Sequence, residues 1–188
     1  MNIFQRIEKK YLLTDELYNE LMRQIEPHLN KDAYYKTTIC NIYFDNDNYD
    51  LIINSLEKPP FKEKVRLRSY DIPSLNDDVY LEIKGKYLGI VYKRRIKLKL
   101  NDYYNYLETG TLPENSQIAK EIKHKFIKYK LKPKLFLAYD RLSYYDKDNI
   151  DFRITFDEFI RSRNEDLKLE YGDAGKLFFN NQIHVMEI

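Results

Sequence analysis

Polar and hydrophobic residues alternate along residues 62–70, which read KEKVRLRSY. A basic residue occupies every second position from Lys62 to Arg68, and Val65 and Leu67 lie between them. Alternate side chains of a β-strand point to the same face of the sheet. The segment therefore predicts a strand with one basic face and one face that is mainly apolar.

Similar patterns predict about eight strands along the chain. They cover residues 6–11, 34–47, 62–71, 79–89, 90–100, 134–146, 150–163 and 182–188. Several strands follow one another directly through short turns such as IPSLNDD, which favours antiparallel pairing. Closure into a barrel would remove the edges of so large a sheet. The pattern predicts an α+β fold built on a closed eight-stranded antiparallel barrel.

Three segments show helical spacing instead: residues 14–29, 101–110 and 115–130. Thr14 is a suitable N-cap for the first, and Asn101 for the second. Gly110 is suited to end the second helix. We expect about three helices flanking the barrel.

Composition indicates a single domain in a reducing compartment. The chain has 188 residues, 32 Lys and Arg against 30 Asp and Glu, and one cysteine, Cys40. No intramolecular disulfide is available, and no apolar run approaches the roughly 20 residues that span a bilayer. Only five glycines are present, which argues against a glycine-rich phosphate loop. We predict a cytoplasmic protein with no membrane segment in residues 1–188.

The charged faces of the predicted strands are mostly cationic. An ordinary solvated face is the default interpretation of such alternation, because most Lys and Arg lie at protein surfaces. A merely solvated face would mix signs, however, and an arginine among bulky apolar residues needs an anionic partner. The cations that we select as phosphate-binding candidates on these faces are Arg6, Lys10, Lys64, Arg66, Arg68, Lys84, Lys93, Arg95, Arg141, Arg153, Arg161 and Arg163.

Three carboxylates lie among these cations: Glu8, Glu82 and Glu187. They either neutralise their neighbours or supply the hard oxygen ligands that Mg²⁺ or Mn²⁺ requires beside phosphates. Both interpretations remain open from the pattern alone. The three histidines are far apart in sequence and lack ligand spacing.

Six blocks carry a family resemblance: RIEKKYLL, NIYFDNDNYDLIINSLEKPPFKEKVRLRSY, VYLEIKGKYLGIVYKRR, PKLFLAYDRLSYY, DFRITFDEFIRSRNEDLKL and HVMEI. In this order they resemble the VTC domain, the polyphosphate polymerase domain of the CYTH-like triphosphate tunnel superfamily. The resemblance implies an eight-stranded tunnel that binds nucleoside triphosphate and polyphosphate. It also implies transfer of the γ-phosphate of ATP to polyphosphate with Mn²⁺ or Mg²⁺.

The resemblance extends to individual residues. It implies that Lys10, Lys84 and Lys93 bind phosphate in the tunnel. It also implies a catalytic role, holding the triphosphate, for four arginines: Arg66, Arg68, Arg141 and Arg153. Glu187 resembles the metal-binding glutamate. The superfamily's E-x-E-x-K opening appears here with Arg6 at its first position. Family members continue beyond the position of Ile188 into a Lys-bearing segment and a helix that close the tunnel, so we expect residues 1–188 to lack that closing segment.

Three functions remain as alternatives. A polymerase needs positioning and charge neutralisation rather than a strong base, because a terminal phosphate oxygen is already anionic. A triphosphatase of the same fold would activate water with Glu8 or Glu82. A non-catalytic module would only bind polyphosphate or another polyanion. We expect ATP and polyphosphate (or triphosphate) as ligands and no nucleic acid, because the net charge is only +2. A membrane-bound partner and the oligomeric state are left open.

Overall fold

The computed structural model describes residues 8–57, 59–88, 90–179 and 183–188. Its α-helices are α1 (Asp15–Ile25), α2 (Asp50–Leu56), α3 (Leu100–Thr109) and α4 (Gln117–Tyr129), with 3₁₀ turns η1 (Glu26–His28) and η2 (Leu169–Tyr171). Its strands are β1 (Lys10–Thr14), β2 (Leu29–Asp45), β3 (Phe61–Tyr70), β4 (Asp78–Tyr87), β5 (Ile90–Lys99), β6 (Lys132–Asp146), β7 (Arg153–Arg163), β8 (Lys176–Leu177) and β9 (Ile183–Glu187).

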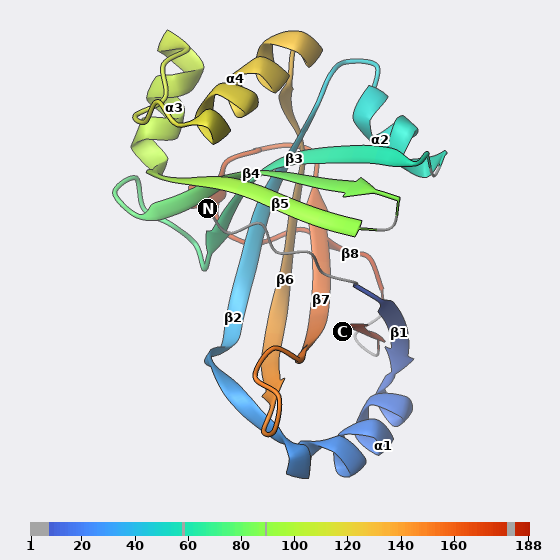
Figure 1. Ribbon diagram of the computed structural model, residues 1–188. Helices are drawn as coiled ribbons and strands as arrows, with labels where there is room; N and C mark the ends of the chain where they lie inside the picture. Colours follow the sequence, from blue (N-terminus) through green and yellow to red (C-terminus); the bar gives the residue numbers. More distant parts are fainter. Residues whose placement is uncertain (1–7, 58, 89, 180–182) are drawn as a thin grey trace.

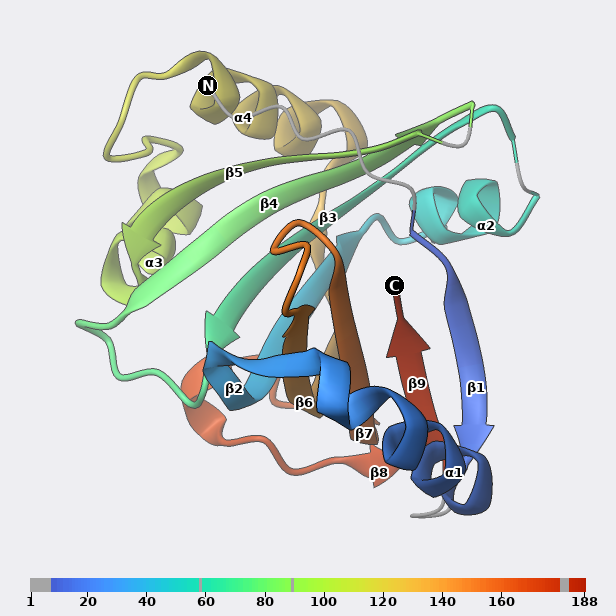
Figure 2. The ribbon, with the colours of Figure 1, turned by 60° about the horizontal axis from the view of Figure 1, so that its bottom comes forward.

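All these strands form one antiparallel sheet, in the order β1-β9-β7-β6-β2-β3-β4-β5 with the short β8 beside β7. The α+β class is confirmed. The closed barrel is not, because β1 and β5 end this order and no pairing joins them within the described residues. The sheet is strongly bent: β3, β4 and β5 cross the long β2, β6 and β7 (Figure 1), and β9 and β1 continue the sheet beyond β7 (Figure 2).

Hydrophobic residues cover the outer face of this curved sheet. Strands β2 to β4 supply Ile42, Val65, Leu67 and Leu81 to a core that α3 and α4 close, and these four side chains are at most 1% exposed. A second cluster, which includes Phe156, packs α1 against β6, β7 and β9. The alternation of the strands therefore places their polar residues on the other, inner face.

Local sequence accounts for the ends of the helices. Thr14 caps α1, since its Oγ1 accepts a hydrogen bond from the backbone N–H of Leu17 (3.4 Å). Gly110 ends α3 with φ 68, a left-handed conformation that glycine adopts without strain. α3 begins at Leu100, so the predicted cap at Asn101 is wrong; instead the Asp102 carboxylate accepts from the backbone N–H of Lys99.

α2 is an additional helix, so four α-helices rather than about three flank the sheet in the described part of the chain. It has only seven residues and follows the tight turn after β2. Asp45 at the end of β2 caps it: its carboxylate oxygens accept from the backbone N–H groups of Leu51 and Ile52 (both 3.0 Å). A helix this short depends on such capping and on tertiary packing rather than on a long periodic pattern.

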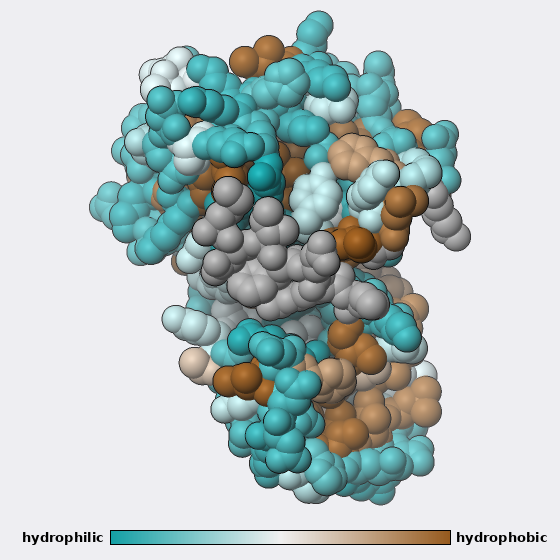
Figure 3. Space-filling view, in the orientation of Figure 1, coloured by the Kyte–Doolittle hydropathy of each residue, from teal (hydrophilic) through white to brown (hydrophobic). Residues whose placement is uncertain are grey.

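The surface in Figure 3 is mainly hydrophilic over β3, β4, β5 and the helices above them, with apolar areas near β1 and α1. Leu12 on β1 and Leu17 on α1 are 63% and 52% exposed. In the described ranges, none of the helices combines the length and the apolar character that a membrane crossing requires. The cytoplasmic location stays a prediction.

Candidate functional site

Three successive rungs of paired residues cross β3, β4 and β5 on the inner face, and we call them the β3–β5 wall. The first rung is Lys64, Lys84 and Lys93; the second is Arg66, Glu82 and Arg95; the third is Arg68, Tyr80 and Lys97. Directly paired residues share one face of an antiparallel sheet. The register thus brings together six of the candidates that alternation had selected one strand at a time, together with Glu82.

Arg66 is buried and held by two neighbours. Its Nε donates to Glu82 Oε2 at 2.8 Å, its Nη2 lies at ion-pair distance from the same oxygen (2.8 Å), and its Nη1 donates to the Tyr43 hydroxyl at 3.3 Å. Burial disfavours the charged form of Glu82, but the charges of Arg66, Arg68 and Lys93 outweigh it and lower the pKa of that carboxyl. Burial likewise opposes ionisation of Tyr43, yet Arg66 and Arg68 lower its pKa to about 8.

Arg68 is held by two neutral groups from other strands. Its Nε donates to Asn41 Oδ1 and its Nη2 to the Tyr139 hydroxyl, each at 2.9 Å. Asn41 and Tyr43 were not selected from the sequence. They occupy alternate positions of β2 directly opposite Arg68 and Arg66, so extending the same alternation to neutral polar residues would have found them.

The lysine rung is the least compensated part of the wall. Lys84 Nζ contacts Glu8 Oε2 at 2.7 Å, across the gap between β4 and the start of β1. Lys64 and Lys93 have no carboxylate within ion-pair distance among the described residues. Lys93 reaches solvent, but protein atoms surround much of it; this environment and the charges of Arg95, Arg68 and Arg66 lower its pKa to about 8, against the opposing effect of Glu82.

The inner faces of β6, β7, β9 and β1 carry a second set of charged residues, and we call them the β6–β1 wall. Arg141 donates from Nε and Nη2 to the two oxygens of Asp157 (2.6 and 2.8 Å). Lys10 and Glu187 are paired residues of β1 and β9 and form an ion pair of 2.8 Å. Burial disfavours ionised Glu187, but Lys10, Lys84 and Arg141 lower its pKa.

Two further candidates lie away from this cluster or outside the described residues. Arg153 is the first residue of β7. Its side chain is 53% exposed and donates to Asp32 Oδ2 at 3.2 Å. Arg6 falls in residues 1–7, outside the part of the chain that the structure describes.

The prediction that Arg161 and Arg163 lie on the inner face is wrong. β7 has one extra residue between Glu158 and Arg161, opposite Ala138–Asp140 of β6, and Phe159 in this bulge has φ 48. One extra residue reverses which face the following side chains occupy. Arg163 instead stacks on Phe136 at 3.6 Å from the outer side.

Both arginines hold the segment after β7. Arg161 donates to the Asp173 backbone oxygen (2.8 Å) and to Asp140 Oδ1 (3.0 Å). Arg163 donates to backbone oxygens of this segment at 2.7–3.1 Å. These hydrogen bonds hold the chain that follows β7, so Arg161 and Arg163 are structural residues rather than phosphate-binding candidates.

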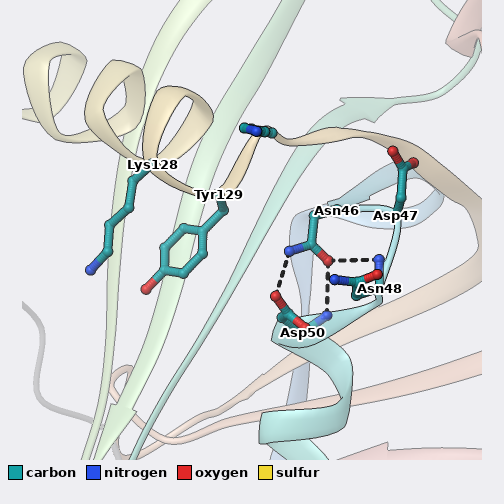
Figure 4. A pocket seen from close by; sticks show the side chains of 7 residues that line it. Asn46, Asp47, Asn48, Asp50, Lys128 and Tyr129 are labelled. Carbon is teal, nitrogen blue, oxygen red and sulfur yellow. Dashed lines mark hydrogen bonds between the residues drawn. The ribbon is translucent and has the colours of Figure 1, made fainter.

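A surface pocket of about 260 Å³ lies on the outside, between the β2–α2 turn and the end of α4 (Figure 4). Its lining residues are Asn46, Asp47, Asn48, Asp50, Lys128, Tyr129 and Lys130. Asn46 Nδ2 donates to Asp50 Oδ2 (2.6 Å), and Asn46 Oδ1 accepts from the backbone N–H groups of Asn48 and Asp50 (both 3.1 Å). These bonds build the turn and suffice to explain the polar residues there.

Comparison of the sequence with known protein families shows to which family this sheet with its basic inner face belongs. A family model for the VTC domain matches residues 5–188. The chain belongs to the VTC domain family. No curated protein matches the chain.

Solved structures share the fold of this VTC domain. A candidate adenylate cyclase from Bacillus halodurans is 14% identical with a TM-score of 0.59, over 100% of this chain and 81% of that one. A second, from Vibrio parahaemolyticus, is 10% identical with a TM-score of 0.54, over 98% and 77%. A third, from Hippeastrum, has a dominant triphosphatase activity; it is 15% identical with a TM-score of 0.51, over 98% and 78%. Identities this low show the fold alone.

The acidic residues of this VTC domain fit a metal ion that is held mainly by its substrate. Within the described ranges, no group of three or more His, Cys, Asp or Glu side chains could hold an ion. Mg²⁺ beside phosphates needs only one or two protein carboxylates. Glu187 keeps 19% of its side chain accessible and suits this role. Glu82 does not, because it is fully buried and held by Arg66.

Proposed function

We propose that this VTC domain transfers the γ-phosphate of ATP to a growing polyphosphate chain along the β3–β5 wall, assisted by Mn²⁺ or Mg²⁺. The observation that carries the proposal is the rung of three directly paired lysines, Lys64, Lys84 and Lys93, beside Arg66 and Arg68. Like charges directly opposite one another are destabilising in a sheet. A polyanion in this position would convert that repulsion into binding energy.

The two buried arginines are suited to position phosphate oxygens. A guanidinium has five N–H donors, and Arg66 uses two of them in hydrogen bonds to Glu82 and Tyr43 while Arg68 uses two on Asn41 and Tyr139. The remaining donors are held in a fixed orientation for charge-assisted bonds to phosphate. Lys10, Lys84 and Lys93 supply further positive charge, and Arg141 faces them from the β6–β1 wall.

Glu187 is the residue that we propose as the metal ligand, with Glu8 as a second candidate beside Lys84. When bound, the ion would spread the charge that develops on the transferred phosphoryl group. The Lys10 ammonium, 2.8 Å from Glu187, helps to lower the pKa of this carboxyl, and a metal ion would compete with Lys10 for its oxygens.

The state of the carboxylates supports transfer over hydrolysis. Attack by water needs a general base, whereas the end of a polyphosphate chain is already anionic near pH 7. Glu8 is paired with Lys84 and Glu82 with Arg66, and the lowered pKa of Glu82 makes it a weaker base. Triphosphatase action is the second candidate, because the Hippeastrum protein of similar fold has that activity.

One experiment separates these functions. The protein is incubated with ATP and Mn²⁺, with and without a short polyphosphate primer, and ADP, orthophosphate and polymer are resolved. Transfer yields ADP and polymer in equal phosphate equivalents, and the primer shortens any lag. Orthophosphate without polymer would establish the triphosphatase instead. Binding of polyphosphate without turnover of ATP would leave a polyanion-binding module.

A further inference from the structure

The β3–β5 wall changes its chemical character from one end to the other. Its first rung consists of three lysines, whereas the third contains the aromatic ring of Tyr80 between Arg68 and Lys97. Along the inner face of β4, Tyr80 is followed by Glu82 and Lys84, so only one end presents an aromatic side chain. A ligand composed solely of phosphates would have no use for this asymmetry.

Tyr80 belongs to a stack that reaches solvent. The guanidinium carbon of Arg95 lies 4.5 Å from the centroid of its ring, and Tyr70 approaches edge-on with centroids 5.6 Å apart. The ring of Tyr80 is half-buried, while Arg95 remains 41% exposed in its side chain and Tyr70 is 43% exposed. We call these residues the Tyr80–Arg95 stack. The Arg95 side chain lies over the Tyr80 ring and stays partly open to solvent, so a flat group of a ligand has access to it.

Flat groups of this kind recognise nucleobases. Bases stack on aromatic rings and on arginine planes without requiring a particular sequence. Tyr80 and Lys84 are four residues apart along β4, which is about 13 Å in a strand, whereas Arg95 and Lys93 are two residues apart along β5. Arg68 is paired with Tyr80 itself, and Arg66 lies one rung closer to the lysines, at the level of Arg95. The two arginines therefore flank the stack on β3, and the lysine rung is the next rung along the wall.

We propose that the Tyr80–Arg95 stack seats the base of a nucleoside triphosphate whose phosphates extend along Arg68 and Arg66 toward the lysine rung. The proposal rests on the proposed function in that it assumes phosphate binding on this wall. It makes a nucleotide, rather than inorganic triphosphate, the preferred donor. It also gives the wall a direction: the terminal phosphate faces the lysine rung, and the acceptor chain reaches it from that end.

The test compares two ligands that differ by the nucleoside. Dissociation constants for ATP and for inorganic triphosphate are measured by calorimetry with the wild-type protein and with Tyr80→Leu, which keeps apolar bulk but removes the ring. We expect Tyr80→Leu to bind ATP roughly 5- to 50-fold more weakly. Its affinity for inorganic triphosphate should change less than twofold. Tyr87→Leu, on the same strand but 54% exposed on the outer face, should change neither affinity.

Every other outcome contradicts the inference. Equal weakening of both ligands would make Tyr80 a structural part of the wall, and unchanged affinity for ATP would place the base elsewhere. Tight wild-type binding of inorganic triphosphate without ATP binding would overturn this inference and leave a phosphate site. Failure to bind either ligand would overturn the proposed function itself. A second measurement covers misfolding of the variant: the wild-type protein should show NMR contacts between adenine protons and side-chain protons of Arg95, and their absence would contradict the stack.

Discussion

The β3–β5 wall and the β6–β1 wall carry similar residues but balance their charges differently. On the β6–β1 wall, Arg141 has Asp157 and Lys10 has Glu187. On the β3–β5 wall, seven of the nine residues in the three rungs are Lys or Arg, and Glu82 is the single carboxylate of the rungs. Glu8 and Asp78 add ion pairs to Lys84 and Lys97, but Lys64, Lys93 and Arg68 have no carboxylate partner among the described residues. Paired charges stabilise the fold, whereas unpaired cations close to one another raise the free energy of the free protein, and under the proposed function a polyanion would compensate them.

The largest effect is expected for Arg66→Ala. We predict a loss of turnover of about 10³-fold, because a preorganised donor to the transferred phosphate is removed. We also predict a loss of roughly 3–5 kcal/mol in the free energy of unfolding, because Glu82 is left buried without its partner. ATP turnover and denaturant unfolding measure the two effects.

Arg66→Ala combined with Glu82→Gln separates them. Removal of the unpaired charge should recover much of the stability but none of the activity. Wild-type turnover in a folded Arg66→Ala protein would remove this arginine from the site.

Arg141→Ala tests the paired wall. Asp157 is 4% exposed and receives two hydrogen bonds from Arg141, so we expect the free energy of unfolding to fall by roughly 3 kcal/mol. The double variant with Asp157→Asn should lose less. Turnover should fall less than in Arg66→Ala. A rate loss as large as that of Arg66→Ala, without loss of stability, would mean that both walls act alike on the ligand.

Lys64→Ala tests the unpaired rung. Relief of repulsion among three lysines should leave stability unchanged or raise it by a few tenths of a kcal/mol. Affinity for polyphosphate should fall roughly 3- to 10-fold, and its dependence on salt should weaken. Lys120→Ala, an exposed position on α4, is the matched control and should change neither quantity. A destabilised Lys64→Ala protein would contradict the charge excess.

The smallest effect is a dependence on pH. Lys93 and Tyr43 both have pKa values lowered to about 8. As pH rises from 7 to 9, Lys93 loses its positive charge and Tyr43 gains a negative one, so affinity for inorganic triphosphate should fall. Lys93→Arg and Tyr43→Phe should each flatten the calorimetric pH profile. A wild-type affinity that does not change over this range would contradict both shifts.

The lowered pKa values of Lys93 and Tyr43 also make the stability of the fold depend on pH, and here a higher pH is favourable. Between about pH 8 and 10 the unfolded chain still holds protons that folded Lys93 and Tyr43 have released. Stability therefore rises with pH in this window, since the unfolded state binds more protons. Cys40, Tyr18 and Tyr106 have raised pKa values and act in the opposite sense above about pH 9. The change in denaturant midpoint from pH 8 to pH 9 is therefore compared between the wild type, Lys93→Arg and Tyr43→Phe, and an equal change in all three would argue against the two shifts.

Much of the site follows from local alternation. Arg66, Arg68, Lys84 and Lys93 lie on the predicted face because regular strands keep a period of two. The same reasoning predicted the wrong face for Arg161, because a bulge at Phe159 reverses the faces of the residues that follow it. The bulge depends on how β7 meets β6, and nothing in the single strand marks it.

The sequence by itself determined the α+β class, the positions of most strands and the basic faces of β3, β4 and β5, because these depend on contacts within a few residues. The tertiary structure decided which charges meet. Glu82 pairs with Arg66, Glu8 reaches Lys84 from the start of β1, and Tyr80 lies beneath Arg95. Strand register and sheet curvature set these contacts, and both arise from packing between residues that are distant in the chain.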